Sequence, residues 1–335
     1  MRLNTANRSF VALVALALVP YGLIGLFCCG ALSLLAYRVS IDGLGVLTDD
    51  WRIWPAIGFF AVVAVGTIRA LLSLRVQLRA TARLGEHVRS RQLAPSRKLE
   101  DAATKARLVG RVVPLDHERA FSFTFGPWHP RVAVSRGLVD AATPDELAAV
   151  LEHERYHVGN LDPLKVLITR AAGPALFYLP VVRDLRRRYV AGRELAADRR
   201  AVGALGAQPL VGALYKATTG PTWSDLGVAA AIGADDLLDL RVTQLETGHE
   251  PAIPRASRAA LVASVLALGL LGAALTFSLV TLGDPARLFS MSNGTTSNDT
   301  ASNVLGMLCC LALWSLLAWA ITRRVRRART VDTQP

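Results

Sequence analysis

The sequence predicts a mostly α-helical membrane protein with four transmembrane spans and an inserted α+β domain that contains a small β-sheet. The chain of 335 residues is 52% hydrophobic and only 19% charged, whereas a soluble domain is typically about 25% charged. Its apolar residues gather into four stretches, each near the roughly 20 residues that cross a bilayer as a helix. Residues 75–258 separate the second stretch from the third and are numerous enough for a domain with its own core.

The four predicted spans divide the chain. They cover residues 9–37, 53–74, 259–282 and 304–322. The first is longer than the apolar region of a secretory signal and has no Ala-x-Ala site after it, so we expect it to remain as an anchor. The predicted domains are two N-terminal spans (1–74), the inserted domain (75–258), two C-terminal spans (259–322) and a basic tail (323–335).

The charge distribution predicts the orientation in the membrane. Arginines crowd residues 75–91 and 323–329, while the short loops 38–52 and 283–303 hold more acidic than basic residues. Excess Arg and Lys stays in the cytoplasm, so both termini and the inserted domain are predicted to be cytoplasmic. The arginines flank spans and lack interleaved aromatic residues, so we expect the lipid bilayer, and not nucleic acid, as their partner.

The first half of the inserted domain is predicted to hold two helices and two strands. Residues 75–93 form a basic helix that ends before Ala94-Pro95-Ser96, and residues 100–109 form a short amphipathic helix. Residues 119–125 alternate, with three Phe on one face and Ala, Ser and Thr on the other, as in a strand. A turn at 126–130 leads to a partner strand, 131–135.

Three further helices are predicted after these strands. Thr143, Pro144 and Glu146 match a capping box, so a helix should run from there to about Val158 and stop at Gly159-Asn160. Asp162-Pro163 begins a second helix in the same manner. Its residues 164–182 are predicted to be buried or to lie on the membrane surface, with a break at Gly173-Pro174; a fifth span stays open. The third helix covers 183–202.

The first of these three helices carries the sequence His153-Glu-Arg-Tyr-His157, an H-E-x-x-H motif. On a helix, the two His side chains at i and i+4 project from one face and reach a single tetrahedral zinc ion. Glu154 lies beside them and is placed to take a proton from a metal-bound water. The domain 75–258 has no cysteine, which excludes a thiolate metal site there. The pattern predicts metal-assisted hydrolysis with one zinc ion per chain.

A third protein ligand is needed, and Glu194 on the predicted helix 183–202 is the strongest candidate. Asp198 lies one turn further along the same face, placed to accept the free N–H of a ligating His. The alternative is that Glu194 only pairs with Arg193 or Arg187 on a solvated face.

These motifs resemble the gluzincin core of membrane metallopeptidases of the M56 and M48 families. The resemblance covers about residues 120–202 and is carried by five segments: 120–126, 130–138, 146–147, 153–157 with Asp162, and Glu194-Leu-Ala-Ala-Asp198. It implies that His153, His157 and Glu194 bind zinc and that Glu154 is the catalytic base. It also implies that the strand with Ser122, Phe123 and Thr124 is an edge to which a substrate backbone adds.

The resemblance has limits that leave several questions open. The best known M56 members are β-lactam sensors with a sensor domain after the last span, and we expect no antibiotic sensing here. The choice between M56 and M48 stays open. His249 and Tyr189 are candidates to stabilise the oxyanion by elimination only, and a loop role and helix packing explain them better.

The sequence therefore predicts a zinc-dependent metalloendopeptidase that acts on membrane or membrane-proximal proteins, with protein or peptide substrates. We expect it in a bacterial plasma membrane. The alternative is a signalling or scaffold membrane protein whose zinc site is structural or cleaves only the chain itself. A basic protein that binds lipid or nucleic acid without catalysis is a third alternative and predicts no bound zinc.

Overall fold

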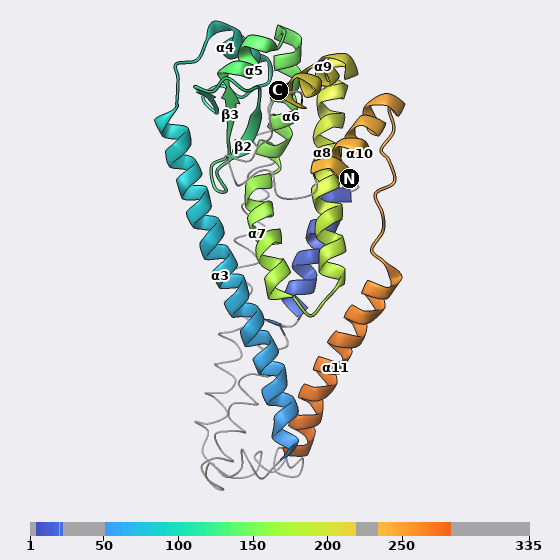
Figure 1. Cartoon of the computed structure of the whole chain (residues 1–335). Helices are drawn as coiled ribbons and strands as arrows, with labels where there is room; N and C mark the ends of the chain where they lie inside the picture. Colours follow the sequence, from blue (N-terminus) through green and yellow to red (C-terminus); the bar gives the residue numbers. More distant parts are fainter. Residues whose placement is uncertain (1–4, 20, 23–50, 219–233, 283–335) are drawn as a thin grey trace, which may run out of the picture.

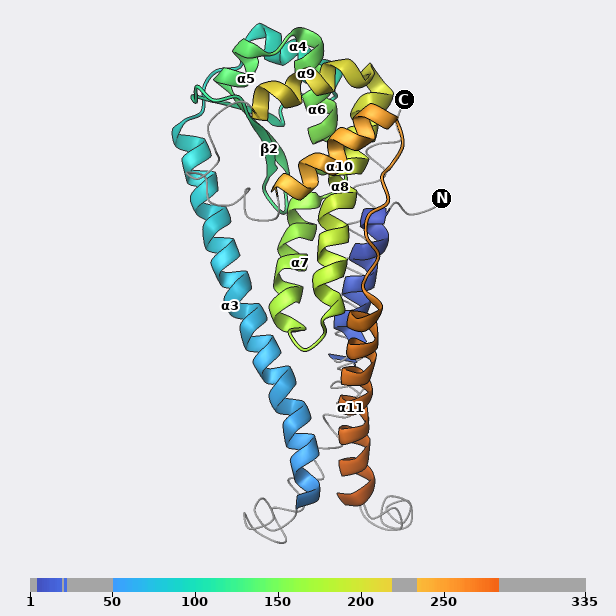
Figure 2. The same cartoon turned by 45° about the vertical axis from the view of Figure 1, so that its right-hand side comes forward.

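The computed structural model describes residues 5–19, 21–22, 51–218 and 234–282. Figures 1 and 2 show an upper part, made of the sheet and several short helices, that stands on a stem of long helices. The sequence prediction of a mostly helical chain with a small sheet is confirmed by the element order.

Two helices of the stem are long and apolar enough to cross a membrane by length and composition. They are the segment Trp51–Ser90, formed by η1 (Trp51–Ile53) and α3 (Trp54–Ser90), and Arg258–Phe277 within α11 (Arg258–Leu282). A shorter apolar helix, Thr5–Val19, lies beside them. The predicted span 304–322, most of 9–37, most of the loop 38–52, the loop 283–303 and the basic tail lie outside the described residues.

Helix α3 corrects one predicted boundary. The span 53–74 and the basic helix 75–93 were expected as separate elements, but they form one helix that ends at Ser90. No proline lies between Pro55 and Pro95, and Arg, Leu and Ala favour helix, so nothing in the sequence interrupts the hydrogen-bond ladder. At 37 residues the helix is roughly 55 Å long, whereas the hydrocarbon core is about 30 Å thick. The arginine-rich end therefore extends well past the apolar part.

The sheet has three strands in the order β1-β3-β2. Strands β1 (Val112–Leu115) and β3 (Arg131–Ser135) are parallel, whereas β2 (Ser122–Phe125) is antiparallel to β3 and lies at an edge. The strand predicted at 119–125 is observed as β2, which begins three residues later, at Ser122. Strand β1 was not predicted, because a strand of four residues shows too little alternation of apolar and polar side chains. The phenylalanine face of β2 packs with Val88 of α3, and this leaves the Ser and Thr face for helix α6.

Helix α6 (Pro144–Gly159) carries the HExxH motif. Its predicted capping box is confirmed: the Thr143 hydroxyl accepts from the Glu146 backbone N–H, and the Glu146 carboxylate accepts from the Thr143 N–H. Helix α4 (Arg97–Lys105), which was predicted at 100–109, and helix α5 (Arg136–Ala141) pack with α6 and β3 around a core of Leu99, Leu138, Leu147 and Leu151. This core fixes α6 against the sheet.

Helices α7 (Asp162–Ala175) and α8 (Val181–Leu205) form a hairpin that runs down the stem and back (Figure 2). They correct the predicted boundaries: the break follows Pro174 by one residue, and the second helix extends beyond 183–202 at both ends. The turn of the hairpin packs between Leu13 of the N-terminal helix and Leu268 of α11. Helices α9 (Ala207–Thr218) and α10 (Ala234–Thr247) cover the upper part of α6 and α8.

Replacement of Gly66 by Ala is expected to destabilise the stem, because the new Cβ would collide with the carbonyl oxygen of Ala175 where α3 meets α7. Overpacking of this kind costs about 1–3 kcal/mol. Gly58→Ala, on the same helix with open space around it, is the control and should stabilise slightly through helix propensity. Thermal unfolding in detergent measures both; a Gly66→Ala melting temperature at or above that of Gly58→Ala would contradict the packing.

Candidate metal centre

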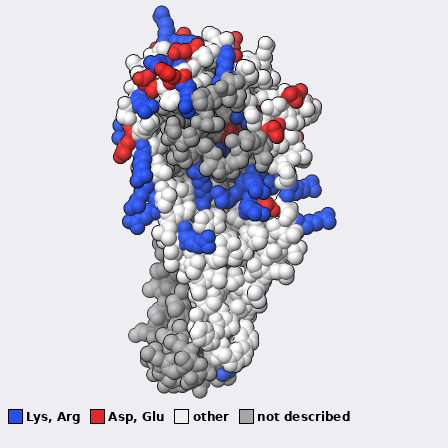
Figure 3. Space-filling model, in the orientation of Figure 1, with Lys and Arg blue, Asp and Glu red and all other residues white. Residues whose placement is uncertain are grey.

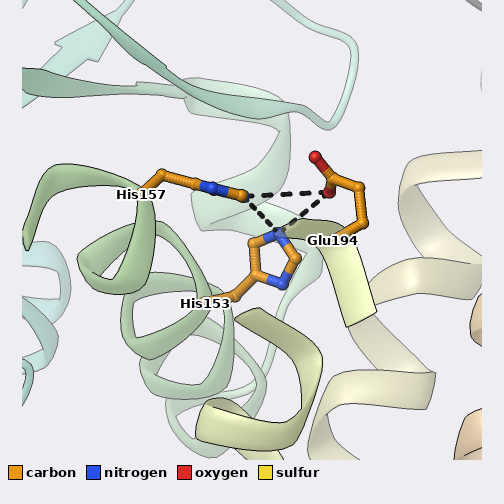
Figure 4. Close-up of side chains that lie close together, drawn as sticks. All are labelled: His153, His157 and Glu194. Carbon is orange, nitrogen blue, oxygen red and sulfur yellow. Dashed lines mark hydrogen bonds and ion pairs between the residues drawn. The ribbon is translucent and has the colours of Figure 1, made fainter. Parts of the chain in front are cut away.

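His153, His157 and Glu194 converge where α6 crosses α8 (Figure 4). The two Nε2 atoms are 3.2 Å apart, and Glu194 Oε2 lies 3.5 Å from Nε2 of His153 and 3.8 Å from Nε2 of His157. Both His residues are buried at 7% exposure. Three ligand atoms from two helices thus face one point in a largely buried site.

These distances fit a tetrahedral zinc ion. Two ligands that each lie about 2.05 Å from zinc at a tetrahedral angle are roughly 3.3 Å apart. The donor set of two imidazole nitrogens and one carboxylate oxygen is that of catalytic zinc sites, where a water completes the coordination. The residues present therefore fit zinc without a rearrangement of the backbone.

Asp162 supports His157 from behind. Its Oδ2 lies 2.6 Å from His157 Nδ1, and its Oδ1 accepts hydrogen bonds from Asn160 Nδ2 at 2.6 Å and from the Tyr189 hydroxyl at 3.2 Å. A carboxylate at Nδ1 favours the tautomer with the proton on Nδ1, which leaves the Nε2 lone pair for a metal. Asp162 does not cap α7 as predicted: the preceding residue, Leu161, takes the left-handed conformation at φ 54° and serves as N-cap. This turn aims the Asp162 side chain at His157.

Asp198 lies behind His153 and is fully buried. Its Oδ1 lies 2.8 Å from His153 Nδ1. Arg241 of α10 binds both carboxylate oxygens, with Nε 2.7 Å from Oδ2 and Nη2 2.8 Å from Oδ1. Burial raises the pKa of Asp198, but the charge of Arg241 and the contact with His153 outweigh it and lower that pKa. Asp198 therefore stays ionised behind the ligand.

The two carboxylate oxygens of Glu194 contact different groups. Oε1 pairs with Arg193 Nε at 3.1 Å, and Oε2 faces the two imidazoles. Burial raises the pKa of Glu194, but the charges of His157 and Arg193 hold it well below its ordinary value. The alternative of a simple surface pair with Arg193 or Arg187 does not describe this placement, because Glu194 contacts Arg193 and the two His residues together.

Glu154 points to strand β2. Ser122 Oγ donates to Oε1 at 2.8 Å, and Thr124 Oγ1 donates to Oε2 at 2.6 Å. Each carboxylate oxygen keeps a second lone pair, so Glu154 can still accept a proton from a water. Phe123, the third predicted edge residue, turns to the opposite face, where it stacks on Phe121 and makes an edge-to-face contact with Phe125.

The two oxyanion candidates lie elsewhere. His249 is exposed in the bend after α10, and its Nδ1 lies 2.8 Å from the Thr247 carbonyl. Tyr189 is fully buried and its hydroxyl is committed to Asp162. Sequence reasoning missed Arg241, the role of Asp162 toward His157, and the bonds from Ser122 and Thr124 to Glu154. Only Asp162 had a local signal, since it follows His157 by five residues in the turn after the motif helix.

Comparison with known proteins agrees with this geometry. Residues 95–219 match the family model of peptidase family M48. That segment contains α4, the sheet and α5 to α9, and therefore every residue of the converging triad. The M56 part of the resemblance is not shown by these comparisons.

Several curated proteins that this chain resembles are described as HtpX protease homologues. The "Protease HtpX homolog" of Aquifex aeolicus is 37% identical over 68 residues, which is 20% of this chain and 22% of that protein. The homologue of Trichormus variabilis is 24% identical over 151 residues, 43% of this chain and 52% of that protein. "Protease HtpX homolog 2" of Methanosarcina acetivorans is 32% identical over 102 residues. The chain thus matches at most about half the length of these relatives.

Arg241→Gln is expected to weaken zinc binding about 10- to 100-fold, because loss of the guanidinium leaves Asp198 poorly compensated behind His153. The control is Arg199→Gln, which removes a cation that pairs with Glu250 at the surface. Competition with a zinc-chelating dye measures both affinities. Wild-type affinity in Arg241→Gln would show that Arg241 does not support the site.

Zinc binding is expected to release protons near neutral pH. In the metal-free protein burial lowers the pKa of His157, but Glu194 and Asp162 outweigh it and raise that pKa to about 10. This raised pKa adds stability to the metal-free fold below the unfolded value of 6.5, and the contribution is lost as the pH rises through about 10. At pH 7.5 zinc must therefore displace a proton. Calorimetry in buffers of different ionisation enthalpy should give a release of at least about one proton; heats independent of buffer would contradict it.

Proposed function

We propose that this chain is a membrane-anchored, zinc-dependent metalloendopeptidase. The observation that carries the proposal is the convergence of His153, His157 and Glu194 within 4.8 Å of one another, with Glu154 on the same helix as the two His residues. The match of residues 95–219 to peptidase family M48 supports this proposal. The similarity to HtpX protease homologues supports it too, although the chain covers only a part of each of those proteins.

In this proposal His153, His157 and Glu194 hold one zinc ion per chain. When bound, zinc lowers the pKa of a coordinated water to near 7 and polarises the scissile carbonyl. The chain's own contribution is orientation. Asp162 and Asp198 hold the two imidazoles with Nε2 toward the common point, and Arg193 holds Glu194 with Oε2 toward it.

Glu154 is proposed as the general base. It takes a proton from the attacking water at its carboxylate and returns it to the leaving nitrogen, so the carboxylate is regenerated at the end of the reaction. Ser122 and Thr124 keep both of its oxygens in place. Positioning by two donors limits the carboxylate to one orientation, which is how a base gains from being preorganised.

Strand β2 is proposed as the edge to which a substrate backbone adds, through Ser122, Phe123 and Thr124. It pairs with β3 on one side, at the end of the described sheet, and extended peptides bind such edges through main-chain hydrogen bonds. Because the side chains of the same strand hold Glu154, a substrate bound there would lie beside the base. The substrates are then peptides or proteins in extended form.

The stem is proposed to confine the enzyme to membrane or membrane-proximal proteins. The four spans, the cytoplasmic placement of the termini and of domain 75–258, and residence in a bacterial plasma membrane belong to this proposal. Its support is the pair of candidate spans and the absence of any break in α3 between its apolar part and the arginines of 75–90.

Glu154→Gln is expected to lower peptidase activity about 10²- to 10⁴-fold and to leave zinc bound, because the amide has the same shape but cannot accept the proton. Glu152→Gln is the matched control: it changes a buried carboxylate two residues earlier that pairs with Arg155 and Arg200. Cleavage of an unfolded membrane-protein substrate in proteoliposomes, together with zinc analysis, measures both variants.

Cleavage by Glu154→Gln at the wild-type rate would refute the proposed base. A chain that binds zinc but cleaves only itself would show a shortened band in the wild type that disappears in Glu154→Gln, with no cleavage of added substrate. A wild type without stoichiometric zinc would refute the metal site itself.

A further inference from the structure

The hairpin α7–α8 carries a strong positive excess. Its residues 163–193 include one acidic side chain, Asp184, whose Oδ2 accepts from the Ser257 backbone N–H at 3.0 Å. The basic side chains of the same segment are Lys165, Arg170, Arg183, Arg186, Arg187, Arg188 and Arg193. Figure 3 shows Lys and Arg gathered across the middle of the molecule, where the charged upper part meets a lower surface with few charges.

Three cations gather around the end of α7: Arg170 and Arg186 of the hairpin, and Arg69 of α3. The guanidinium of Arg186 reaches back to α7, with Nη1 2.7 Å from where a Cβ of Gly173 would lie. About one turn further, Arg69 of α3 lies over the Phe177 ring, 5.0 Å from its centre. Burial, followed by the charges of Arg193 and Arg186, lowers the pKa of Arg170, so Arg170 lies within electrostatic reach of both.

The charge of Arg186 is not compensated within the chain as described. The described residues (5–19, 21–22, 51–218 and 234–282) give its guanidinium no hydrogen bond and no ion pair, although the side chain is only partly exposed. Partial burial of the Arg186 charge costs free energy unless an anion neutralises it. A guanidinium is suited to bind phosphate oxygens in pairs. The site therefore favours a phosphate-bearing ligand.

The position of these cations along the stem favours a lipid as the source of the phosphate. Ala175 contacts Gly66 in the middle of the apolar part of α3, and Arg170 lies five residues back along α7, about 8 Å toward the catalytic end. The neighbouring surface of α3 is apolar and exposed: Ile68 is 57%, Leu71 60% and Leu72 56% exposed, and Phe177 is 42% exposed. A phosphate bound here would have acyl chains beside it, as in a lipid.

We propose that Arg170 and Arg186, with Arg69 beside them, bind the phosphate of an anionic glycerophospholipid in the leaflet on the catalytic side of the membrane. Basic side chains between membrane helices recognise anionic head groups in this manner. The lipid would lie against both arms of the hairpin that carries Glu194 and Asp162. This site is separate from the metal centre and does not depend on the proposed peptidase activity.

The test uses the full-length protein, stripped of lipid in detergent and offered mixed micelles of phosphatidylglycerol and phosphatidylcholine. Retained lipid is measured by native mass spectrometry. The wild type should retain phosphatidylglycerol about tenfold or more over phosphatidylcholine, and Arg170→Gln/Arg186→Gln should lose this preference. Arg97→Gln/Arg131→Gln is the control: it removes the same charge from exposed positions at the start of α4 and of β3 in the upper part and should keep the preference.

Three outcomes would overturn the proposal. One is equal retention of the two lipids by the wild type, which is decisive even if the double variant fails to fold. Another is an unchanged preference in a folded Arg170→Gln/Arg186→Gln variant. The third is displacement of phosphatidylglycerol by inorganic phosphate at equal concentration, since that would make the site one for free phosphate and not for lipid.

Discussion

The packing of α6 against α8 is the constraint on which the candidate site depends. His153 and His157 come from one helix and Glu194 from the other, so the distance between helix axes sets the distance between ligand atoms. Small residues make a close approach possible: Ala149 of α6 and Ala201 of α8 are fully buried in the same apolar cluster. Larger side chains at these positions would separate the helices and with them the three ligands.

The site also depends on a balance of buried charge. Glu194, Asp162 and Asp198 bring three carboxylates close to two imidazoles, and Arg193 and Arg241 compensate part of the negative charge. In the metal-free state the same carboxylates raise the pKa of both His residues. A field that attracts a proton to these nitrogens also attracts a divalent cation, so the arrangement that makes His157 basic favours metal binding.

The hairpin α7–α8 connects this balance to the stem. Asp162 begins α7 directly after the left-handed turn at Leu161, and Glu194 lies on the returning arm. The N-terminal helix packs on the same arm, where Ala6 lies close to Gly192, and Lys165 of α7 donates to Asn7 at 2.8 Å. Metal ligands and their supporting groups therefore stand on the elements that the apolar stem holds in place.

Local patterns in the sequence determined the parts of this protein whose interactions are local. The capping box, the i and i+4 spacing of His153 and His157, and the alternation of strand β2 all involve residues within one turn or one strand, so they can be read from the chain directly. The span 259–282 corresponds to α11 for the same reason, since length and hydropathy decide it.

Only the tertiary structure decided which distant groups meet. Glu194 was a candidate by distance along the chain and helix face, but its approach to the imidazoles follows from how α8 packs on α6. Arg241 follows Asp198 by 43 residues, and Ser122 precedes Glu154 by 32. Such contacts carry no periodic signal, because they depend on packing between elements and not on the geometry within one.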